Sequence, residues 1–279
     1  MPMRSSPRRT FLWAAAGVVA MAARSPRRTA ASTRLQTTAN ASLTSVKALV
    51  FDVFGTVVDW RTSVATQVEE LARRKGLKVD GAAFADAWRA QYAPSMNQVR
   101  TGELPWTTLD RLHRMSLDRL LPEFGVTGLS ADDTDDLNRA WHRLNPWPDS
   151  VAGLRRLKRK FIIAPLSNGN ISLMTRMAKH ADLPWDCILG AELAKHYKPD
   201  PEVYQSAAAY LDLPPGDVMM VAAHLPDLRG AKAVGLRTAF VVRASEFGDS
   251  TTRRPDLTAD DSVDVSARDF NHLATLLGA

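Results

Sequence analysis

The sequence predicts an α/β fold: a doubly wound, Rossmann-like parallel sheet with a helical cap inserted after the first strand. Short apolar runs alternate with amphipathic helical patterns through the second half of the chain, whereas residues 59–145 carry helical patterns without a good strand pattern. The 279 residues, 45% hydrophobic and 24% charged, have the ordinary composition of a globular protein and suffice for one sizeable core.

Apolar runs mark the expected strands. The first, at residues 45–51, ends at Asp52 and is soon followed by Gly55, as in a buried strand that leads into a tight loop. The others lie at 161–166, 187–190, 218–222 and 238–242, with helical patterns between them at 171–181, 201–211 and 226–234. Strands and helices that alternate in this way favour a parallel sheet covered by helices on both faces.

Residues 59–145 interrupt this alternation. Helical patterns lie at 62–75, 82–92, 107–120 and 131–143. We therefore expect a helical cap at 59–145 and an α/β core built from 46–58 and 146–279. An insertion at this point lies over the carboxyl ends of the strands, where parallel sheets place their active sites, and can act as a lid.

Residues 1–45 are predicted to be a twin-arginine-like export signal and a disordered linker. Arg8 and Arg9 precede an apolar stretch at 13–23, and Ala-Met-Ala at 20–22 offers a cleavage site. The stretch is well short of the roughly 20 residues that span a bilayer, so we expect no stable membrane span. The signal predicts a periplasmic or exported protein; a start codon placed too early would instead leave it cytoplasmic.

The positive charge of the chain belongs to this leader. The net charge is +6, but seven arginines precede Asp52, the first acidic residue, so residues 35–279 carry a net charge of −1. A near-neutral body gives no electrostatic reason to bind nucleic acid or anionic membranes. Cys187 is the single cysteine, which excludes an intrachain disulfide and a zinc site built from cysteines.

Polar clusters follow four of the strand patterns. Asp52 and Thr56 follow the first strand, and Ser167 and Asn168 end the second. A Tyr-Lys-Pro-Asp segment containing Lys198 follows the third, and a segment from His224 to Asp227 follows the fourth. Because the carboxyl ends of parallel strands meet at one edge of the sheet, these clusters are expected to converge on one pocket.

The order and spacing of these clusters resemble the haloacid dehalogenase superfamily over residues 46–275, and within it the type II haloacid dehalogenases. The phosphatases of that superfamily carry a second aspartate two residues after the nucleophile and an acidic pair that holds magnesium. Here these places are Phe54 and Ala223, the latter beside the retained Asp227. Phosphoryl transfer needs a protonated leaving group and charge neutralisation by the metal, so the resemblance implies dehalogenation without a metal or other cofactor.

The resemblance implies that Asp52 attacks a small 2-haloacid in line and forms an aspartyl ester, which water then hydrolyses to the 2-hydroxyacid. A halide leaves as a stable anion, so the nucleophile needs only to be ionised and poorly hydrated. Lys198 would keep Asp52 ionised through its positive charge, and Thr56 would offer its hydroxyl to the carboxylate. Asp227 would orient or deprotonate the water.

The substrate carboxylate is expected to bind Ser167 and the backbone N–H groups near Val53 and Phe54, with Asn168 facing the departing halide. A Ser-Asn-Gly turn that caps the next helix is the alternative for Ser167 and Asn168, and it is compatible with a role in the site.

Arg89 and Tyr204 complete the expected site. Arg89 lies in a segment that resembles the one whose arginine closes over substrate and halide, and a guanidinium suits an anion in a dry cavity. A surface arginine on an amphipathic helix is the alternative. Tyr204 matches a tyrosine near the site of the family, or packs on the apolar face of its own helix.

The fourth motif departs from the family. It reads Ala222-Ala223-His224 where the best-studied pattern has Ser-Ser-Asn. Our hypothesis is that His224 replaces the missing amide as an additional base, because an ordinary imidazole exchanges protons near neutrality.

Two other classes of function stay open. One is another hydrolase of the same fold, either a phosphatase or an enzyme that opens a small ring. The other is a non-catalytic exported binding protein, although Asp52 and Lys198 are both present. Homodimers are common in the family, and the sequence leaves the oligomeric state open.

Overall fold

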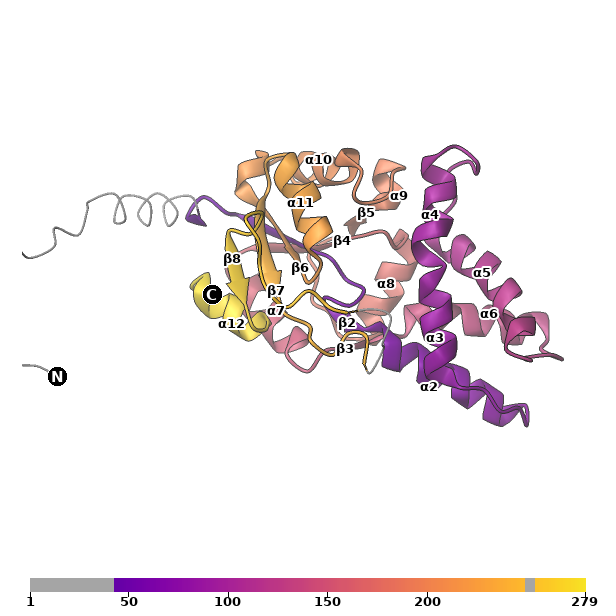
Figure 1. Cartoon of the computed structure of the whole chain (residues 1–279). Coiled ribbons are helices and arrows are strands. Elements are labelled where there is room, and N and C mark those ends of the chain that lie inside the picture. The colour runs from indigo at the N-terminus through magenta and orange to yellow at the C-terminus, as the bar shows by residue number, and fades with distance from the viewer. Residues whose placement is uncertain (1–42, 249–253) are drawn as a thin grey trace, which may run out of the picture. The chain divides into compact units, whose positions relative to one another are not determined.

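The computed structural model describes residues 43–248 and 254–279 (Figure 1). The leader and linker predicted at 1–45 lie almost wholly outside the described residues. Among the helices that are described, none is long and apolar enough to cross a membrane.

The centre of the fold is a parallel sheet of six strands in the order β5-β4-β1-β6-β7-β8. The chain starts in the middle at β1, moves outward to β4 and β5, and returns to β6 on the other side of β1. The predicted doubly wound parallel sheet is confirmed. The last strand, β8, was not predicted. The strands are β1 (Ala48–Phe51), β4 (Ile162–Ser167), β5 (Leu189–Gly190), β6 (Val218–Ala222), β7 (Arg237–Val241) and β8 (Val265–Ala267).

Helices cover both faces of this sheet (Figure 1). Side chains of a strand alternate between faces, so Ala48 and Val50 of β1 join one buried cluster while Leu49 and Phe51 join another. Helices α10 and α11 pack in the first cluster, and α7, α8 and α12 in the second. These helices and the short ones beside them are α7 (Ser150–Lys158), α8 (Ile171–His180), α9 (Ala191–Ala194), α10 (Pro201–Tyr210), η2 (Pro215–Asp217), α11 (Leu225–Ala233) and α12 (Phe270–Leu276).

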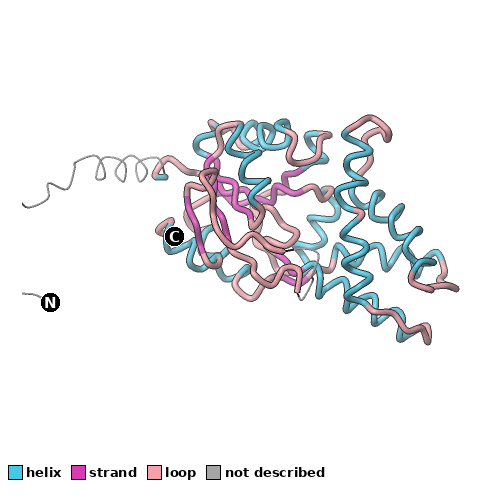
Figure 2. The backbone as a smooth tube through the Cα atoms, in the orientation of Figure 1, coloured by secondary structure: helices cyan, strands magenta, loops and turns pink. Residues whose placement is uncertain are grey.

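The cap leaves and rejoins the core through a short antiparallel pair, β2 (Val58–Asp59) with β3 (Asn145–Pro146). Between them the chain is helix and loop throughout (Figure 2). The cap helices are α2 (Trp60–Arg74), α3 (Gly81–Ala90), α4 (Tyr92–Arg100), α5 (Leu109–Glu123), α6 (Ala131–Asn138) and η1 (Arg139–His142).

Local chemistry sets the ends of these helices. The carboxylates of Asp59 and Asp80 accept hydrogen bonds from the first turns of α2 and α3, and Ser130 caps α6. The single helix predicted at 82–92 ends at Ala90, and α4 begins at Tyr92. Pro94 has no N–H to donate to the carbonyl of residue 90, so a continuous helix through this point would lose that bond.

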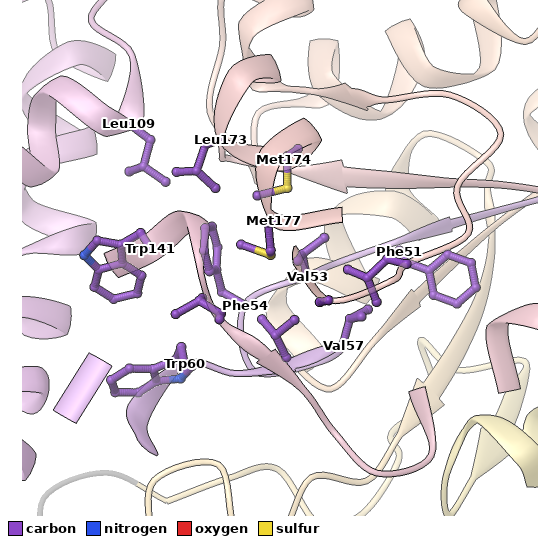
Figure 3. Close-up of a cluster of buried hydrophobic side chains, with 14 of the residues drawn as sticks. Phe51, Val53, Phe54, Val57, Trp60, Leu109, Trp141, Leu173, Met174 and Met177 are labelled. Carbon is purple, nitrogen blue, oxygen red and sulfur yellow. The ribbon is translucent and has the colours of Figure 1, made fainter. Parts of the chain in front are cut away.

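Cap and core share one apolar cluster. Phe54, in the loop after β1, packs edge-on against Trp141 of the cap with ring centroids 5.8 Å apart. Figure 3 shows these side chains in one cluster with Trp60 of α2 and with Met174 and Met177 of α8. The loop that follows the first strand is therefore held by the cap as well as by the sheet.

Candidate active site

Asp52 lies at the carboxyl end of β1 and is buried. Its backbone N–H still donates to the carbonyl of Val221 in β6, so the sheet fixes the residue. The hydroxyl of Thr56 donates to Oδ2 of Asp52 at 2.7 Å and accepts from the backbone N–H of Ala223 at 2.9 Å. Gly55 has a φ of +85°, which lets the chain turn back and bring Thr56 to the carboxylate.

Lys198 lies between two carboxylates. Its Nζ donates to Oδ1 of Asp52 at 3.0 Å and to Oδ2 of Asp227 at 2.5 Å. The backbone N–H of Lys198 donates to Oδ1 of Asn168 at 2.7 Å, which fixes the segment before α10. The other oxygen of Asp227 accepts from the hydroxyl of Tyr204 at 2.6 Å. The expected lysine and both expected carboxylates therefore form one hydrogen-bonded chain.

The pKa values of Asp52 and Asp227 are shifted in opposite directions. Burial raises the pKa of Asp52, but the charge of Lys198 and the hydrogen bonds from His224 and Thr56 outweigh burial and hold the pKa well below its usual range. Burial raises the pKa of Asp227, and the charge of Asp52 adds to this, against the opposing charge of Lys198. Asp52 is therefore an ionised nucleophile, while Asp227 keeps a higher affinity for a proton.

His224 lies between Asp52 and a third carboxylate, Glu246. Its Nδ1 is 3.0 Å from Oδ2 of Asp52, and its Nε2 is 2.9 Å from Oε2 of Glu246. Burial lowers the pKa of His224, but the charge of Glu246 and the hydrogen bond to Asp52 outweigh it and raise the pKa to about 10. The resting imidazole is therefore protonated and donates to Asp52, so its expected role as a base stays a prediction for a later step of the reaction.

These groups line one cavity of about 520 Å³. Cap and core both contribute to its wall. The cap residues are Arg89, Tyr92, Ala93 and Met96. The core residues are Asp52, Asn168, Lys198, Pro199, Tyr204, His224, Pro226, Asp227, Phe247 and Arg254. The cavity therefore encloses the nucleophile between core and cap.

The guanidinium of Arg89 has buried hydrogen-bond donors that lack a partner among the described residues. Within the described residues, its Nε and one terminal nitrogen are buried and have no hydrogen-bond partner. The guanidinium lies 3.9 Å from the ring centroid of Tyr92 and 5.5 Å from that of Trp60. A buried donor without a partner is costly, so an anion that enters here gains more than it would at the surface.

A family model described as a haloacid dehalogenase-like hydrolase matches residues 46–235. The chain belongs to this family. (S)-2-haloacid dehalogenase 1 of Pseudomonas sp. strain CBS-3 is 32% identical over 207 residues, which cover 72% of this chain and 86% of that protein.

Two solved structures agree with this membership. A defluorinating L-2-haloacid dehalogenase is 51% identical with a TM-score of 0.81, over 84% of this chain and 96% of its own. Another L-2-haloacid dehalogenase is 47% identical with a TM-score of 0.80, over 84% of this chain and 99% of its own. The resemblance inferred from the motifs, down to the L-2-haloacid dehalogenases, is confirmed.

Not every expected residue of this haloacid dehalogenase-like hydrolase reaches the cavity. Thr56 lies behind Asp52, whereas Ser167, Val53 and Phe54 are not among the described residues that line the wall. The hydroxyl of Ser167 is fully buried and accepts from the backbone N–H of Gly169 at 3.1 Å, whereas the N-cap of α8 is Asn170. The other expected residues, Asp52, Arg89, Asn168, Lys198, Tyr204, His224 and Asp227, do line it.

Sequence reasoning missed Glu246 and Tyr92. Glu246 follows β7, and the rule that the carboxyl ends of parallel strands meet at one edge applies to that strand as well. Tyr92 is the first residue of α4, after α3 ends at Ala90, and its side chain lines the cavity. Among residues 43–248 and 254–279, no group of three or more His, Cys, Asp or Glu side chains is arranged to hold a metal ion.

Proposed function

We propose that the chain hydrolyses small 2-haloacids to 2-hydroxyacids through an ester on Asp52. The observation that carries this proposal is the ionised, buried carboxylate of Asp52, which Lys198 and Thr56 hold at a cavity with unpartnered donors on Arg89. The similarity to (S)-2-haloacid dehalogenase 1 and to the two L-2-haloacid dehalogenase structures supports the same substrate class.

In the first step an oxygen of Asp52 attacks the carbon that carries the halogen, and the carbon–halogen bond breaks on the opposite side. The halide leaves with the bonding electrons and needs no proton. Arg89 lines the cavity from the cap, and its positive charge suits the departing anion and the substrate carboxylate. The burial of Asp52 keeps the nucleophile poorly hydrated, which favours displacement over solvation.

In the second step a water molecule attacks the carbonyl carbon of the Asp52 ester, and the bond from this carbon to the ester oxygen breaks, so that the former Asp52 oxygen leaves as the hydroxyl of the product. Asp227 and His224 are the titratable groups beside Asp52 that can receive a proton from this water. The products are the hydroxyacid and the restored carboxylate, and one proton is released for each halide.

We further propose that 2-fluoroacids are among the substrates. The support is the 51% identity to a defluorinating L-2-haloacid dehalogenase. Fluoride is a small anion that accepts strong hydrogen bonds, and the two buried, unpartnered nitrogens of Arg89 can donate them as the carbon–fluorine bond breaks.

The test is release of chloride from L-2-chloropropionate and monochloroacetate, and of fluoride from fluoroacetate, by the purified chain with EDTA present. Halide release that vanishes in Asp52→Asn supports the proposal. Absence of halide release, together with magnesium-dependent cleavage of a phosphate ester, would replace it with phosphatase activity.

We also propose export through the leader, on the strength of Arg8, Arg9 and the short apolar stretch after them. A reporter fused to residues 1–45 should reach the periplasm, and replacing both arginines with lysine should retain it in the cytoplasm. Equal export of both fusions would refute a twin-arginine route.

A further inference from the structure

His224 joins the nucleophile to a carboxylate that takes no direct part in the reaction. Each ring nitrogen faces a carboxylate oxygen, Asp52 on one side and Glu246 on the other. Because carboxylates at these distances accept hydrogen bonds, both nitrogens must carry protons in the resting site. With both carboxylates ionised, the geometry therefore points to an imidazolium between two anions.

Glu246 is placed for this contact by its surroundings. Its side chain is 1% exposed, and besides His224 it accepts from Nε1 of Trp60 at 3.1 Å. A Cβ on Gly55 would lie 2.1 Å from Oε1 of Glu246, so the glycine also makes room for the carboxylate. A carboxylate this buried is stable only if its charge is matched, and the matching cation is His224.

Charged groups approach His224 from several elements. They are Asp52 at the end of β1, Lys198 before α10, Asp227 on α11, Arg89 in the cap, and Glu246, Arg254 and Asp256 after β7. Among the residues that the structure describes, Asp52 and Glu246 are the two that bond to the imidazole ring. Of these two, Asp52 changes its charge during the reaction, because its ester is neutral.

We propose that Glu246 is a positioning residue that couples the protonation of His224 to the state of Asp52. His224 donates to the ionised nucleophile before displacement, and after the ester forms it becomes the base that takes a proton from the attacking water. This inference rests on the proposed function, since it needs the ester on Asp52.

The protons balance over one cycle. When the ester forms, Nδ1 of His224 loses its anionic partner, and the imidazolium releases this proton to solvent, with the halide as counter-ion. The neutral Nδ1 then takes one proton from the water whose oxygen bonds to the carbonyl carbon of Asp52. The remaining proton of that water goes to the departing ester oxygen, which becomes the hydroxyl of the product. The new imidazolium is again hydrogen-bonded to an ionised Asp52.

Asp227 is less free to act in this step. Both of its oxygens are engaged, one with Lys198 and the other with Tyr204, and neither contact is removed when the ester forms. Ester formation instead releases Nδ1 of His224, while Glu246 still holds Nε2 and keeps the ring aimed at the ester. The base thus becomes available only when there is an ester to hydrolyse.

The test separates ester formation from ester hydrolysis in Glu246→Gln, with the full chain and L-2-chloropropionate. Rapid-quench halide release reports the first step, and mass spectrometry of the protein reports the ester. We expect the first step to stay within about threefold of wild type, and ester hydrolysis to slow by about tenfold or more so that ester accumulates. The matched control is Glu192→Gln, whose carboxylate caps the N-terminus of α8 and lies outside the cavity wall.

The pH profile of ester hydrolysis distinguishes positioning from a structural defect. Loss of the Glu246 charge lowers the pKa of His224, so the midpoint of this profile should move to lower pH by more than about one unit. In a His224→Ala background, Glu246→Gln should have no further effect on the rate, because it acts through the ring. An unmoved midpoint, or an undiminished effect in that background, would overturn the inference.

A second measurement does not depend on the folding of any Glu246 variant. Asp52→Asn imitates the neutral ester, and nuclear magnetic resonance of labelled histidine reports the protonation of His224. The midpoint of His224 should lie more than about one pH unit lower in Asp52→Asn than in wild type. Identical midpoints would refute the coupling, whereas a failure of wild type to release halide would refute the proposed function itself.

Discussion

Replacing Lys198 with methionine removes the cation between two buried carboxylates. Its Nζ is 3.0 Å from Asp52, and at an effective dielectric constant of about 20 the attraction is about 5.5 kcal/mol, or about four pKa units. The hydrogen bonds from Thr56 and His224 stay, so we expect the pKa of Asp52 to rise by about two units or more. Asp227 loses its cation as well, and the two carboxylates then compete for one proton.

The sign follows from which form reacts. Only ionised Asp52 attacks the substrate, so a raised pKa removes activity as the pH falls through the new value. The rate of ester formation in wild type should be nearly flat from about pH 3 to about pH 8, while in Lys198→Met it should fall about tenfold per pH unit below the new pKa, at the acid end of this range. Rapid-quench halide release across this range measures it.

The control is Lys195→Met, an exposed lysine on the same segment that lies outside the cavity wall. It should retain the flat wild-type profile. If Lys198→Met shows the same flat profile with normal ester formation, then Lys198 does not keep Asp52 ionised, and the attribution of its low pKa to that charge is wrong.

Three further outcomes are expected. Arg89→Gln should lower kcat/KM for halide release by about a hundredfold, because the side chain that we propose to bind the anion loses its charge; an unchanged value would show that Arg89 does not bind it. Tyr204→Phe removes one donor to Asp227 and should lower the free energy of unfolding by about 1–3 kcal/mol, measured by urea denaturation, with an unchanged midpoint as the contrary result. Burial raises the pKa of Asp149, but the hydrogen bonds and charge of Arg243 hold it below its usual value, so this pair stabilises the fold at neutral pH and less as the pH falls; the melting temperature of Asp149→Asn should therefore depend less on acid than that of wild type.

The sheet and the nucleophile could be predicted because both depend on short-range patterns. A buried strand that ends at Asp52 with Gly55 after it requires only the local sequence, and β1 lies where that pattern places it. The segments that contain Lys198 and Asp227 could be placed as well, since the parallel sheet fixes where each strand ends. The lysine in fact donates hydrogen bonds to both aspartates.

The remainder depends on tertiary contacts that no local pattern carries. Glu246 reaches the site because His224 and Trp60 donate to it, and these residues are far away in the sequence. Ser167 is expected to bind substrate, and its hydroxyl accepts from the backbone N–H of Gly169, which leaves the hydroxyl proton for another partner. The choice between a local hydrogen bond and a ligand is decided by the direction of one side chain, which composition and spacing do not report.

The substitution in the fourth motif is best understood as one of a pair. An imidazolium at His224, where the best-studied pattern has a neutral amide, adds a positive charge beside a nucleophile that Lys198 already stabilises. A further cation lowers the pKa of Asp52 and so weakens it as a nucleophile, unless another anion offsets the charge. Glu246 is that anion, and it would itself be an unmatched buried charge without His224. Each residue offsets the charge of the other, so exchanging both should lower the free energy of unfolding by less than the sum of the two single exchanges.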